Sequence, residues 1–393
     1  MKTRLRIPRF LFAALSLFLV AILATGCDST DVINEPEPTA LGRSGDGSLN
    51  KILGSVRSRN DLPALAALLV RGGAVVEADA VGLRALGYPE AVTVEDRWHV
   101  GSITKSMTAT LAGVLVEQGV IAWETTLTET FPDLAGTMRA AYADVRLDEL
   151  LSNTSGMGGI SDAAFWDTSF DPTAPVAVQR RLLTAELLTM APAAARGTYQ
   201  YSNAGYIVAG AMLEAVTGQS WEALMRTHLL GPLGMTSTGF GAPGSAGRRD
   251  EPLGHVPDGA SWQPLDPAHL EADLPAVIGP AGTVHTTLAD AARYMAAHLA
   301  GAQGIDGLVS AQTFAKLHQA APGTAYALGW NVSNGVLLHD GSNERWLAWM
   351  IIAPERDEAI FAVTNCADET KAAKGIDDAL TALYERARAA FGQ

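Results

Sequence analysis

The stretch that decides the fold reads VGSITKSM and spans residues 100–107. It places Ser102 three residues before Lys105, and it opens a run with apolar residues at helical spacing, including Met107, Leu111 and Val114. Spacings of three and four put such residues on one face of a helix. We therefore expect Ser102 at the first turn of this helix, with Lys105 one turn later on the same side.

This pair of residues suits covalent catalysis. A serine hydroxyl is a poor nucleophile until a neighbouring base takes its proton. Lys105 can be that base only when its ammonium is deprotonated, and burial favours the neutral form. The start of a helix adds backbone N–H groups and partial positive charge, which stabilise a developing oxyanion. The plain alternative is that Ser102 caps the helix and Lys105 is solvated, because both residue types are common.

Two further motifs follow in chain order, Tyr201-Ser202-Asn203 and His339-Asp340-Gly341. Together the three motifs resemble the signature of the serine β-lactamase and penicillin-binding-protein superfamily. Tyr-x-Asn and His-x-Gly are similar to the class C β-lactamase-related branch, which contains esterases and D-aminopeptidases. The resemblance extends over most of the chain after residue 50 and implies a serine hydrolase that works through an acyl-serine.

The resemblance also implies roles for the first two motifs. Ser102 would be the nucleophile and Lys105 its first base. Tyr201 would be a second proton shuttle, and since a phenol titrates near ~10, it needs a nearby lysine cation to act as a base. Asn203 would orient Lys105 and a substrate amide. Taken alone, Tyr201 and Asn203 are better explained as an aromatic plug and a cap in a loop.

The third motif carries a histidine where better-known members of the superfamily carry a lysine. His339 is expected to donate a hydrogen bond to Tyr201 or to a substrate carboxylate, and to change charge near neutral pH. Gly341 leaves room for a substrate beside its strand. In the superfamily the next residue, here Ser342, pairs its backbone N–H with that of Ser102 to bind the oxyanion.

The histidine also leads to an expectation about substrates. Above its pKa it offers one neutral N–H, which suits an ester carbonyl better than a carboxylate. We therefore expect short esters to be better substrates than penicillins at mildly alkaline pH. His339→Lys should favour substrates that bear a carboxylate over neutral ones.

The pattern of apolar runs predicts an α+β fold of the β-lactamase/transpeptidase type. Two runs joined by Gly72-Gly73 predict a hairpin near one end, and further runs after residue 327, with the hairpin signal Asn334-Gly335, predict strands near the other. We expect one antiparallel sheet from both chain ends, flanked by helices. A mainly helical subdomain, about residues 105–310, would be inserted between them.

Three shorter segments receive simpler predictions. Residues 239–266 are rich in Gly, Pro and Asp and are expected to form a long surface loop beside the cleft. Residues 279–282 are expected to form a turn, and residues 328–332 a strand. Asn153 stands where the superfamily often has a histidine, and a structural role is expected for it.

The first 27 residues are expected to lie outside the fold. Basic residues precede an apolar run that ends in LATGC at residues 23–27, which resembles a bacterial lipoprotein signal peptide. Cys27 would then be lipidated and anchor the protein at the periplasmic face of a bacterial membrane. An ordinary signal peptide or an uncleaved anchor are the alternatives. Residues 28–48 are expected to be a flexible linker, and residues 49–393 the hydrolase domain.

Composition excludes several other classes of function. The 393 residues carry a net charge of −14, which makes the chain a poor nucleic-acid binder. His285, His298 and His318 lack metal-ligand spacing, and no glycine-rich phosphate loop stands out, so we expect neither a metal nor a cofactor. Cys366 is expected to be a small buried apolar residue.

The natural substrate is left open by the sequence. The first alternative is an esterase or peptidase-like hydrolase acting on an ester, amide or β-lactam. The second is a true β-lactamase or D,D-carboxypeptidase, and the third is a penicillin-sensing or cell-wall-binding protein that acylates without turnover. All three would accept a small molecule or cell-wall peptide, because the choice lies in the cleft walls.

Overall fold

A six-stranded antiparallel sheet runs through the centre of the computed structural model, which describes residues 48–159 and 174–391. Its strand order is β2-β1-β11-β10-β9-β8. The strands are β1 (Ala64–Arg71), β2 (Ala74–Gly82), β8 (Asn331–Ser333), β9 (Val336–Ser342), β10 (Leu347–Ala353) and β11 (Glu358–Thr364). Pairing of β1 with β11 joins both ends of the chain in one sheet, as predicted.

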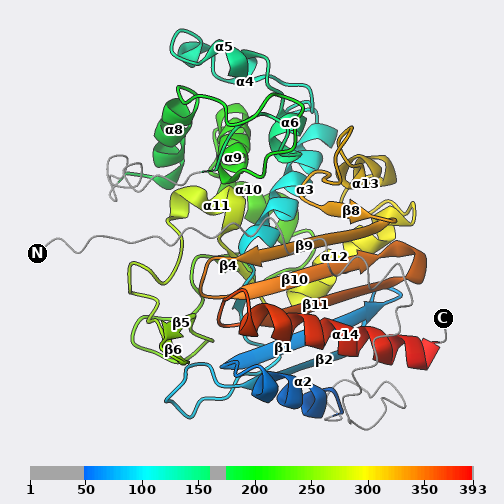
Figure 1. Ribbon diagram of the computed structural model, residues 1–393. Helices are drawn as coiled ribbons and strands as arrows, with labels where there is room; N and C mark the ends of the chain where they lie inside the picture. Colours follow the sequence, from blue (N-terminus) through cyan, green and yellow to red (C-terminus); the bar gives the residue numbers. More distant parts are fainter. Residues whose placement is uncertain (1–47, 160–173, 392–393) are drawn as a thin grey trace, which may run out of the picture.

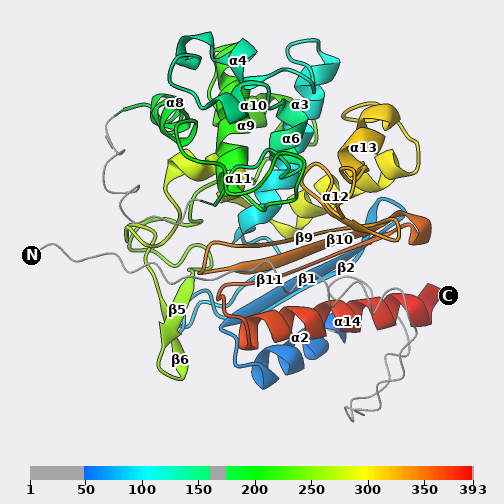
Figure 2. The same cartoon turned by 45° about the horizontal axis from the view of Figure 1, so that its top comes forward.

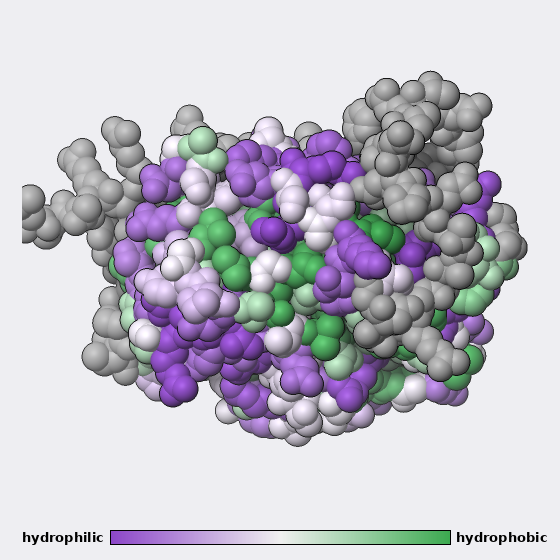
Figure 3. Space-filling model, turned by 90° about the horizontal axis from the view of Figure 1, so that it is seen from below, coloured by the Kyte–Doolittle hydropathy of each residue, from purple (hydrophilic) through white to green (hydrophobic). Residues whose placement is uncertain are grey.

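Helices from the two chain ends cover one face of this sheet. They are α2 (Ser48–Arg59) and α14 (Lys371–Phe391); α14 crosses in front of the sheet in Figure 1, and both helices lie below it in Figure 2. Leu65, Ala67 and Leu69 of β1 belong to the apolar cluster on this side, whereas Leu68 and Val70 belong to the cluster on the other. Because both faces are covered, β1 is an unbroken apolar run. Figure 3 looks at the molecule from below, where hydrophilic and apolar residues are interspersed.

The opposite face carries the mainly helical subdomain, drawn above the sheet in Figure 2. Its helices are α3 (Thr104–Glu117), α4 (Leu127–Thr130), α5 (Ala140–Ala143), α6 (Leu147–Leu151), α8 (Val176–Leu187), α9 (Asn203–Thr217), α10 (Trp221–Met225), α11 (Gly279–Gly282), α12 (Leu288–Ala302) and α13 (Ala311–His318). In α3 and α9 most residues are buried, which marks them as the central helices of this layer. The predicted α+β architecture is confirmed.

Three local predictions need correction. Residues 239–266 include short strands as well as loop: β4 (Gly239–Phe240) pairs with β7 (Val284–Thr286), and β5 (His255–Asp258) pairs with β6 (Ser261–Pro264). Residues 279–282, predicted as a turn, form the short buried helix α11.

The strand predicted at residues 328–332 begins only at Asn331, as β8. Gly329 has a φ of +80°, and a Cβ on it would lie 2.5 Å from the Cα of Ser106. The chain therefore turns tightly against α3 at this point before it can enter the sheet. The hairpin predicted at Asn334-Gly335 is confirmed, with φ values of +49° and +77°.

Candidate active site

Ser102 lies where the strand β3 (Trp98–His99) gives way to helix. It occupies the 3₁₀ turn Gly101–Ile103, which runs directly into α3, so its predicted place at a helix start is confirmed. Gly101 has a φ of +50°, and a Cβ on it would lie 2.3 Å from the backbone nitrogen of Ser342. Only glycine fits both that conformation and that approach. The turn leaves Ser102 partly exposed.

Lys105 is fully buried and touches the nucleophile. Its Nζ lies 2.9 Å from Ser102 Oγ, 2.7 Å from Asn203 Oδ1 and 2.8 Å from the carbonyl oxygen of Ala281. The two carbonyl-type oxygens can only accept hydrogen bonds. A neutral amine has two hydrogens and one lone pair, so Asn203 and Ala281 take the hydrogens and the lone pair faces Ser102. This is the arrangement that a general base requires.

Burial tunes Lys105 to this task. It lowers the pKa of Lys105 to about 7, because the ammonium loses its water, and the carboxylate of Asp340 opposes the change only in part. The neutral form of Lys105 is therefore accessible at neutral pH. A lysine in water titrates near ~10.4 and would be almost wholly charged there.

Tyr201 lies beside the same lysine, and an interaction of its hydroxyl with Ser102 is one of the influences on its pKa. Lys105 Nζ lies 4.7 Å from the centre of the Tyr201 ring. Burial raises the pKa of Tyr201 well above its ordinary range, and the interaction with Ser102 lowers it only in part. Tyr201 is thus a protonated phenol that can donate a proton. The Lys105 cation was expected to lower the pKa of Tyr201 so that it could act as a base, but it does not offset the rise that burial causes.

His339 differs from its prediction. Its Nδ1 hydrogen-bonds the carbonyl oxygen of Asp340, which can only accept, so Nδ1 carries the proton. Nε2 lies 2.9 Å from the Tyr326 hydroxyl and accepts its hydrogen. Burial, with a smaller contribution from Lys105, lowers the pKa of His339 to about 3.

Both ring nitrogens of His339 are therefore occupied, and the ring is neutral at neutral pH. The prediction that His339 changes charge near pH 7 is wrong, because the imidazole has no water to stabilise its cation. Its hydrogen bonds go to Tyr326 and the backbone, so Tyr201 is not its partner here. The residue type alone, read from the sequence, did not disclose this burial.

The end of β9 passes Ser102 at backbone contact distance. A Cβ on Gly341 would lie 2.0 Å from the carbonyl oxygen of Val100 and 2.6 Å from the nitrogen of Ser102. Glycine is therefore required here by the close approach of two backbones. The same approach brings Ser342 beside the nucleophile's turn, because its nitrogen lies 2.3 Å from the Cβ position of Gly101. The joint role of the Ser102 and Ser342 nitrogens in binding an oxyanion stays a prediction.

Sequence reasoning missed two contributors to the site, His99 and the backbone carbonyl of Ala281. His99 Nδ1 accepts the Gly101 N–H at 3.1 Å, so Nε2 carries the proton and faces Asp273 Oδ1 at 3.1 Å. The ring also stacks on Trp346 at a centroid distance of 5.5 Å. His99 thereby fixes the turn before the nucleophile, and its place three residues before Ser102 was the available signal. Ala281 contributes only a backbone carbonyl, for which a sequence offers no signal.

The loop that carries the second motif is hydrogen-bonded to the side chain of Asn153. Its Oδ1 accepts the backbone N–H of Ser202 at 3.0 Å, and its own φ is +58°. The Ser202 side chain caps α9 by accepting the Gly205 N–H at 2.9 Å. These bonds place Tyr201 and Asn203 on either side of a fixed cap, so the structural role expected for Asn153 is confirmed.

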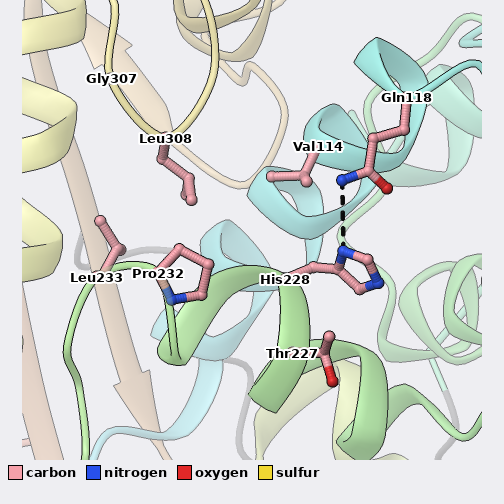
Figure 4. Close-up of a pocket in the computed structure, with 8 residues that line it drawn as sticks. All are labelled: Val114, Gln118, Thr227, His228, Pro232, Leu233, Gly307 and Leu308. Atoms are coloured by element: carbon pink, nitrogen blue, oxygen red, sulfur yellow. Dashed lines mark hydrogen bonds between the residues drawn. The ribbon is translucent and has the colours of Figure 1, made fainter.

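A separate pocket lies at the other end of α3. It has a volume of about 420 Å³ and is drawn in Figure 4, with Val114 and Gln118 on one side and His228 and Leu308 among the residues around it. Val114 is twelve residues beyond Ser102, which corresponds to roughly 18 Å along a helix. The pocket is therefore distinct from the nucleophile's surroundings. Within residues 48–159 and 174–391, no three His, Cys, Asp or Glu side chains group as a metal site would.

The comparisons with known proteins agree with this geometry. Residues 49–384 match the Beta-lactamase family. Penicillin-binding protein 4 of Amycolatopsis lactamdurans is 27% identical, over 79% of this chain and 83% of that protein. Unguisins hydrolase ungD of Aspergillus violaceofuscus (strain CBS 115571) is 29% identical over 55% of this chain, which spans 39% of that protein's length.

Solved structures share the fold at lower identity. The octameric penicillin-binding protein homologue from Pyrococcus abyssi has a TM-score of 0.68 at 21% identity, covering 87% of this chain and 78% of its own. The crystal structure of SurE has a TM-score of 0.69 at 22% identity, covering 87% and 76%. The family match spans nearly all of the described residues, including all three motifs. The chain therefore belongs to the Beta-lactamase family and is a serine hydrolase of that family.

Proposed function

We propose that this chain is an esterase or peptidase-like hydrolase that turns over esters or amides through an acyl-serine. One observation carries the proposal: Lys105 Nζ lies 2.9 Å from Ser102 Oγ while Asn203 Oδ1 and the Ala281 carbonyl hold its hydrogens. A pKa of about 7 leaves the amine free to act as a base at physiological pH.

The proposed reaction begins when neutral Lys105 takes the proton of Ser102 as Oγ attacks the substrate carbonyl. The N–H groups of Ser102 and Ser342 hold the oxyanion. The ester or amide bond then breaks, and the Tyr201 phenol gives its proton to the leaving oxygen or nitrogen. The Lys105 ammonium returns a proton to Tyr201. Water releases the acyl group by the same proton route in reverse.

A neutral His339 supports esters and amides over penicillins. A lysine at this position would offer a fixed positive charge to a substrate carboxylate, whereas a neutral imidazole with both nitrogens bonded offers none. The name of the unguisins hydrolase relative also favours turnover. A β-lactamase or D,D-carboxypeptidase is the second candidate, favoured by the likeness to penicillin-binding protein 4. A protein that acylates without turnover is the third.

The first experiment tests the nucleophile. A fluorophosphonate or a fluorescent penicillin should label the protein, and Ser102→Ala should abolish the label. Ser106→Ala is the matched control, because Ser106 lies on the same helix but bonds the Ile103 carbonyl and Tyr294. Labelling that survives in Ser102→Ala would refute the assignment.

The second experiment tests turnover. A p-nitrophenyl ester, a penicillin and a D-alanyl-D-alanine peptide are compared by kcat/KM. A burst of one equivalent followed by steady release is expected for the ester. A burst without a steady phase would instead identify the non-turnover protein, and a penicillin turned over far faster than the ester would identify a β-lactamase.

We also propose that the hydrolase domain is held at a bacterial membrane by a lipid on Cys27, with residues 28–48 as a tether. The proposal rests on the LATGC stretch, since residues 1–47 lie outside the described residues. In the part of the chain that is described, no helix has the length and apolar character needed to cross a membrane. Cys27→Ser should move the protein from the membrane to the soluble fraction, and an unchanged distribution would refute lipidation at this residue.

A further inference from the structure

We propose that Asp273 aligns the two backbone N–H groups that hold the oxyanion, one on Ser102 and one on Ser342. The inference rests on the acyl-serine reaction proposed above and names a positioning residue for it. Asp273 lies between β6 and α11 and belongs to none of the three motifs. It acts through one side chain on each of the two segments that carry the donors.

One carboxylate oxygen of Asp273 collects three polar contacts. Oδ1 lies 3.1 Å from His99 Nε2 and accepts hydrogen bonds from Asn343 Nδ2 at 2.8 Å and from the Leu274 backbone N–H at 2.7 Å. The contact with His99 is close in distance but falls short of hydrogen-bond geometry. The Asp273 side chain is 10% exposed, and His99 and Asn343 are buried. The bond to Leu274 holds the carboxylate in place, and the other two contacts reach segments far apart in the sequence.

The contact with His99 leads to the nucleophile's turn. His99 Nδ1 accepts the N–H of Gly101 at 3.1 Å, and Gly101 directly precedes Ser102. A neutral imidazole accepts at Nδ1 only when its proton is on Nε2. The negative charge of Asp273 beside Nε2 favours that tautomer. Asp273 thus keeps Nδ1 available to hold Gly101 at its φ of +50°, and the peptide that begins at Gly101 carries the Ser102 N–H.

The contact with Asn343 leads to the end of β9. Asn343 directly follows Ser342, and its Oδ1 accepts two backbone N–H groups of the turn after β9, both at 3.1 Å. Its Nδ2 donates to Asp273, so the amide is bonded at both ends. Trp346 in the same turn stacks on His99 at a centroid distance of 5.5 Å, which connects the two segments a second time.

The alignment of the two donors depends on how these segments approach each other. The Ser342 nitrogen lies 2.3 Å from the Cβ position of Gly101, so the backbones are already in contact. An oxyanion is stabilised only when its donors lie about 2.7–3.1 Å from the oxygen atom, so a small shift of either segment weakens one donor. Asp273 contacts a neighbour of each donor, and it is therefore placed to keep both in range.

The test compares a p-nitrophenyl ester with its thionoester, in which sulfur replaces the carbonyl oxygen. Both release p-nitrophenol when Ser102 Oγ adds to the carbon, its proton passes to Lys105 and the bond to the leaving oxygen breaks. Sulfur is a weak hydrogen-bond acceptor, so aligned donors favour the ester. The rate constant for release of the first equivalent is measured for each reagent and divided by its rate with hydroxide. The oxygen-to-sulfur ratio of these values reports the donors, because a change in stability or in the base affects both reagents alike.

Asp273→Ala should lower the oxygen-to-sulfur ratio by about 10-fold, a part of the loss expected when a donor is removed outright. Asp273→Asn keeps an oxygen that accepts from both partners and should hold the ratio within about 3-fold of the wild-type value. Glu271→Ala is the matched control, because it removes an exposed carboxylate two residues earlier on the same loop. It should leave the ratio unchanged.

Asn343→Asp tests the second segment and serves if Asp273→Ala does not fold. Aspartate keeps an oxygen for the two backbone N–H groups but replaces the Nδ2 donor with an oxygen that repels Asp273. The ratio should fall by about 10-fold here as well. An unchanged ratio in Asp273→Ala, or in Asn343→Asp if the first variant does not fold, would overturn the proposal. An equal fall in Glu271→Ala would do the same.

Release of the first equivalent keeps this inference apart from the proposed function, because it needs an acyl-serine but no turnover. If the wild-type protein releases one equivalent and stops, the hydrolase proposal fails, and a lower ratio in Asp273→Ala still supports the role of Asp273. Steady turnover with an unchanged ratio in that variant would leave the hydrolase proposal standing and overturn this one. No release from either reagent by the wild-type protein would overturn both.

Discussion

The pH dependence of kcat/KM for a neutral ester should report the ionisation of Lys105. The amine acts as a base only when neutral, and its pKa is about 7 in the folded protein. The neutral fraction is then about 9% at pH 6 and about 91% at pH 8. Activity should therefore rise about 10-fold between these two pH values and level off above pH 8.

The neighbouring groups predict the rest of the profile. Burial raises the pKa of Tyr201, so this residue should cause no fall in activity up to about pH 9. The pKa of His339 is lowered to about 3, so His339 should not contribute to the rise. Asp340→Asn removes a charge that raises the pKa of Lys105, and the rise should move to lower pH.

The assay follows a short neutral ester from pH 5 to 9 at constant ionic strength, with His339→Gln as the control variant. Glutamine keeps a donor and an acceptor for the two partners of His339 but cannot titrate. The rise should stay near pH 7 in this variant, even if the rate falls. A flat profile in the wild-type protein, or loss of the rise in His339→Gln, would refute the assignment of the base to Lys105.

Three further predictions concern a close backbone contact, a buried ion pair and the protonation of Lys105. Gly341→Ala must push β9 away from Val100, whose carbonyl oxygen would lie 2.0 Å from the new Cβ, so kcat should fall by about 10²–10³. Gly54→Ala, with open space on α2, should leave kcat unchanged. Arg180→Met should lower the unfolding free energy by about 3–5 kcal/mol, because Glu214 and Glu222 lose their buried partner. Urea denaturation should show part of this loss regained at low pH, because burial raises the pKa of Glu214 and its carboxyl then takes up a proton. Between pH 7 and 10, Lys105 is less protonated in the folded protein than in the unfolded chain. The stability of the wild-type protein to urea should therefore fall as the pH drops from 10 to 7, and Lys105→Met should lack this dependence.

The sheet was predictable because its sequence signals are local. Turns occur at Gly72-Gly73 and Asn334-Gly335, where the backbone has positive φ values that few other residues adopt. The apolar runs on either side of these turns have the length of strands. The same reasoning gave a wrong start for the strand predicted at residues 328–332. The run is apolar, but contact between Gly329 and Ser106 of α3, far away in the sequence, bends the chain.

The candidate site was predictable where a side chain carries the chemistry. Ser102, Lys105, Tyr201 and Asn203 come from two segments about a hundred residues apart, and the structure brings all four together. The state of His339 was not predictable, because it depends on burial and on Tyr326 as a partner. The motif identified the position of the residue, and its electrostatic environment decided its charge.

The basicity of Lys105 depends on packing between helices that the motifs do not include. The Ala281 carbonyl lies on α11, and the adjacent Pro280 carbonyl accepts a hydrogen bond from Thr108 of α3 at 2.7 Å. A Cβ on Gly210 of α9 would lie 2.3 Å from Pro280, so α9 and α11 can meet this closely only through a glycine. This close contact helps to exclude water from Lys105, and that exclusion lowers its pKa. Loosening α11 would therefore hydrate Lys105, raise its pKa and remove the base at neutral pH, even with every motif residue in place.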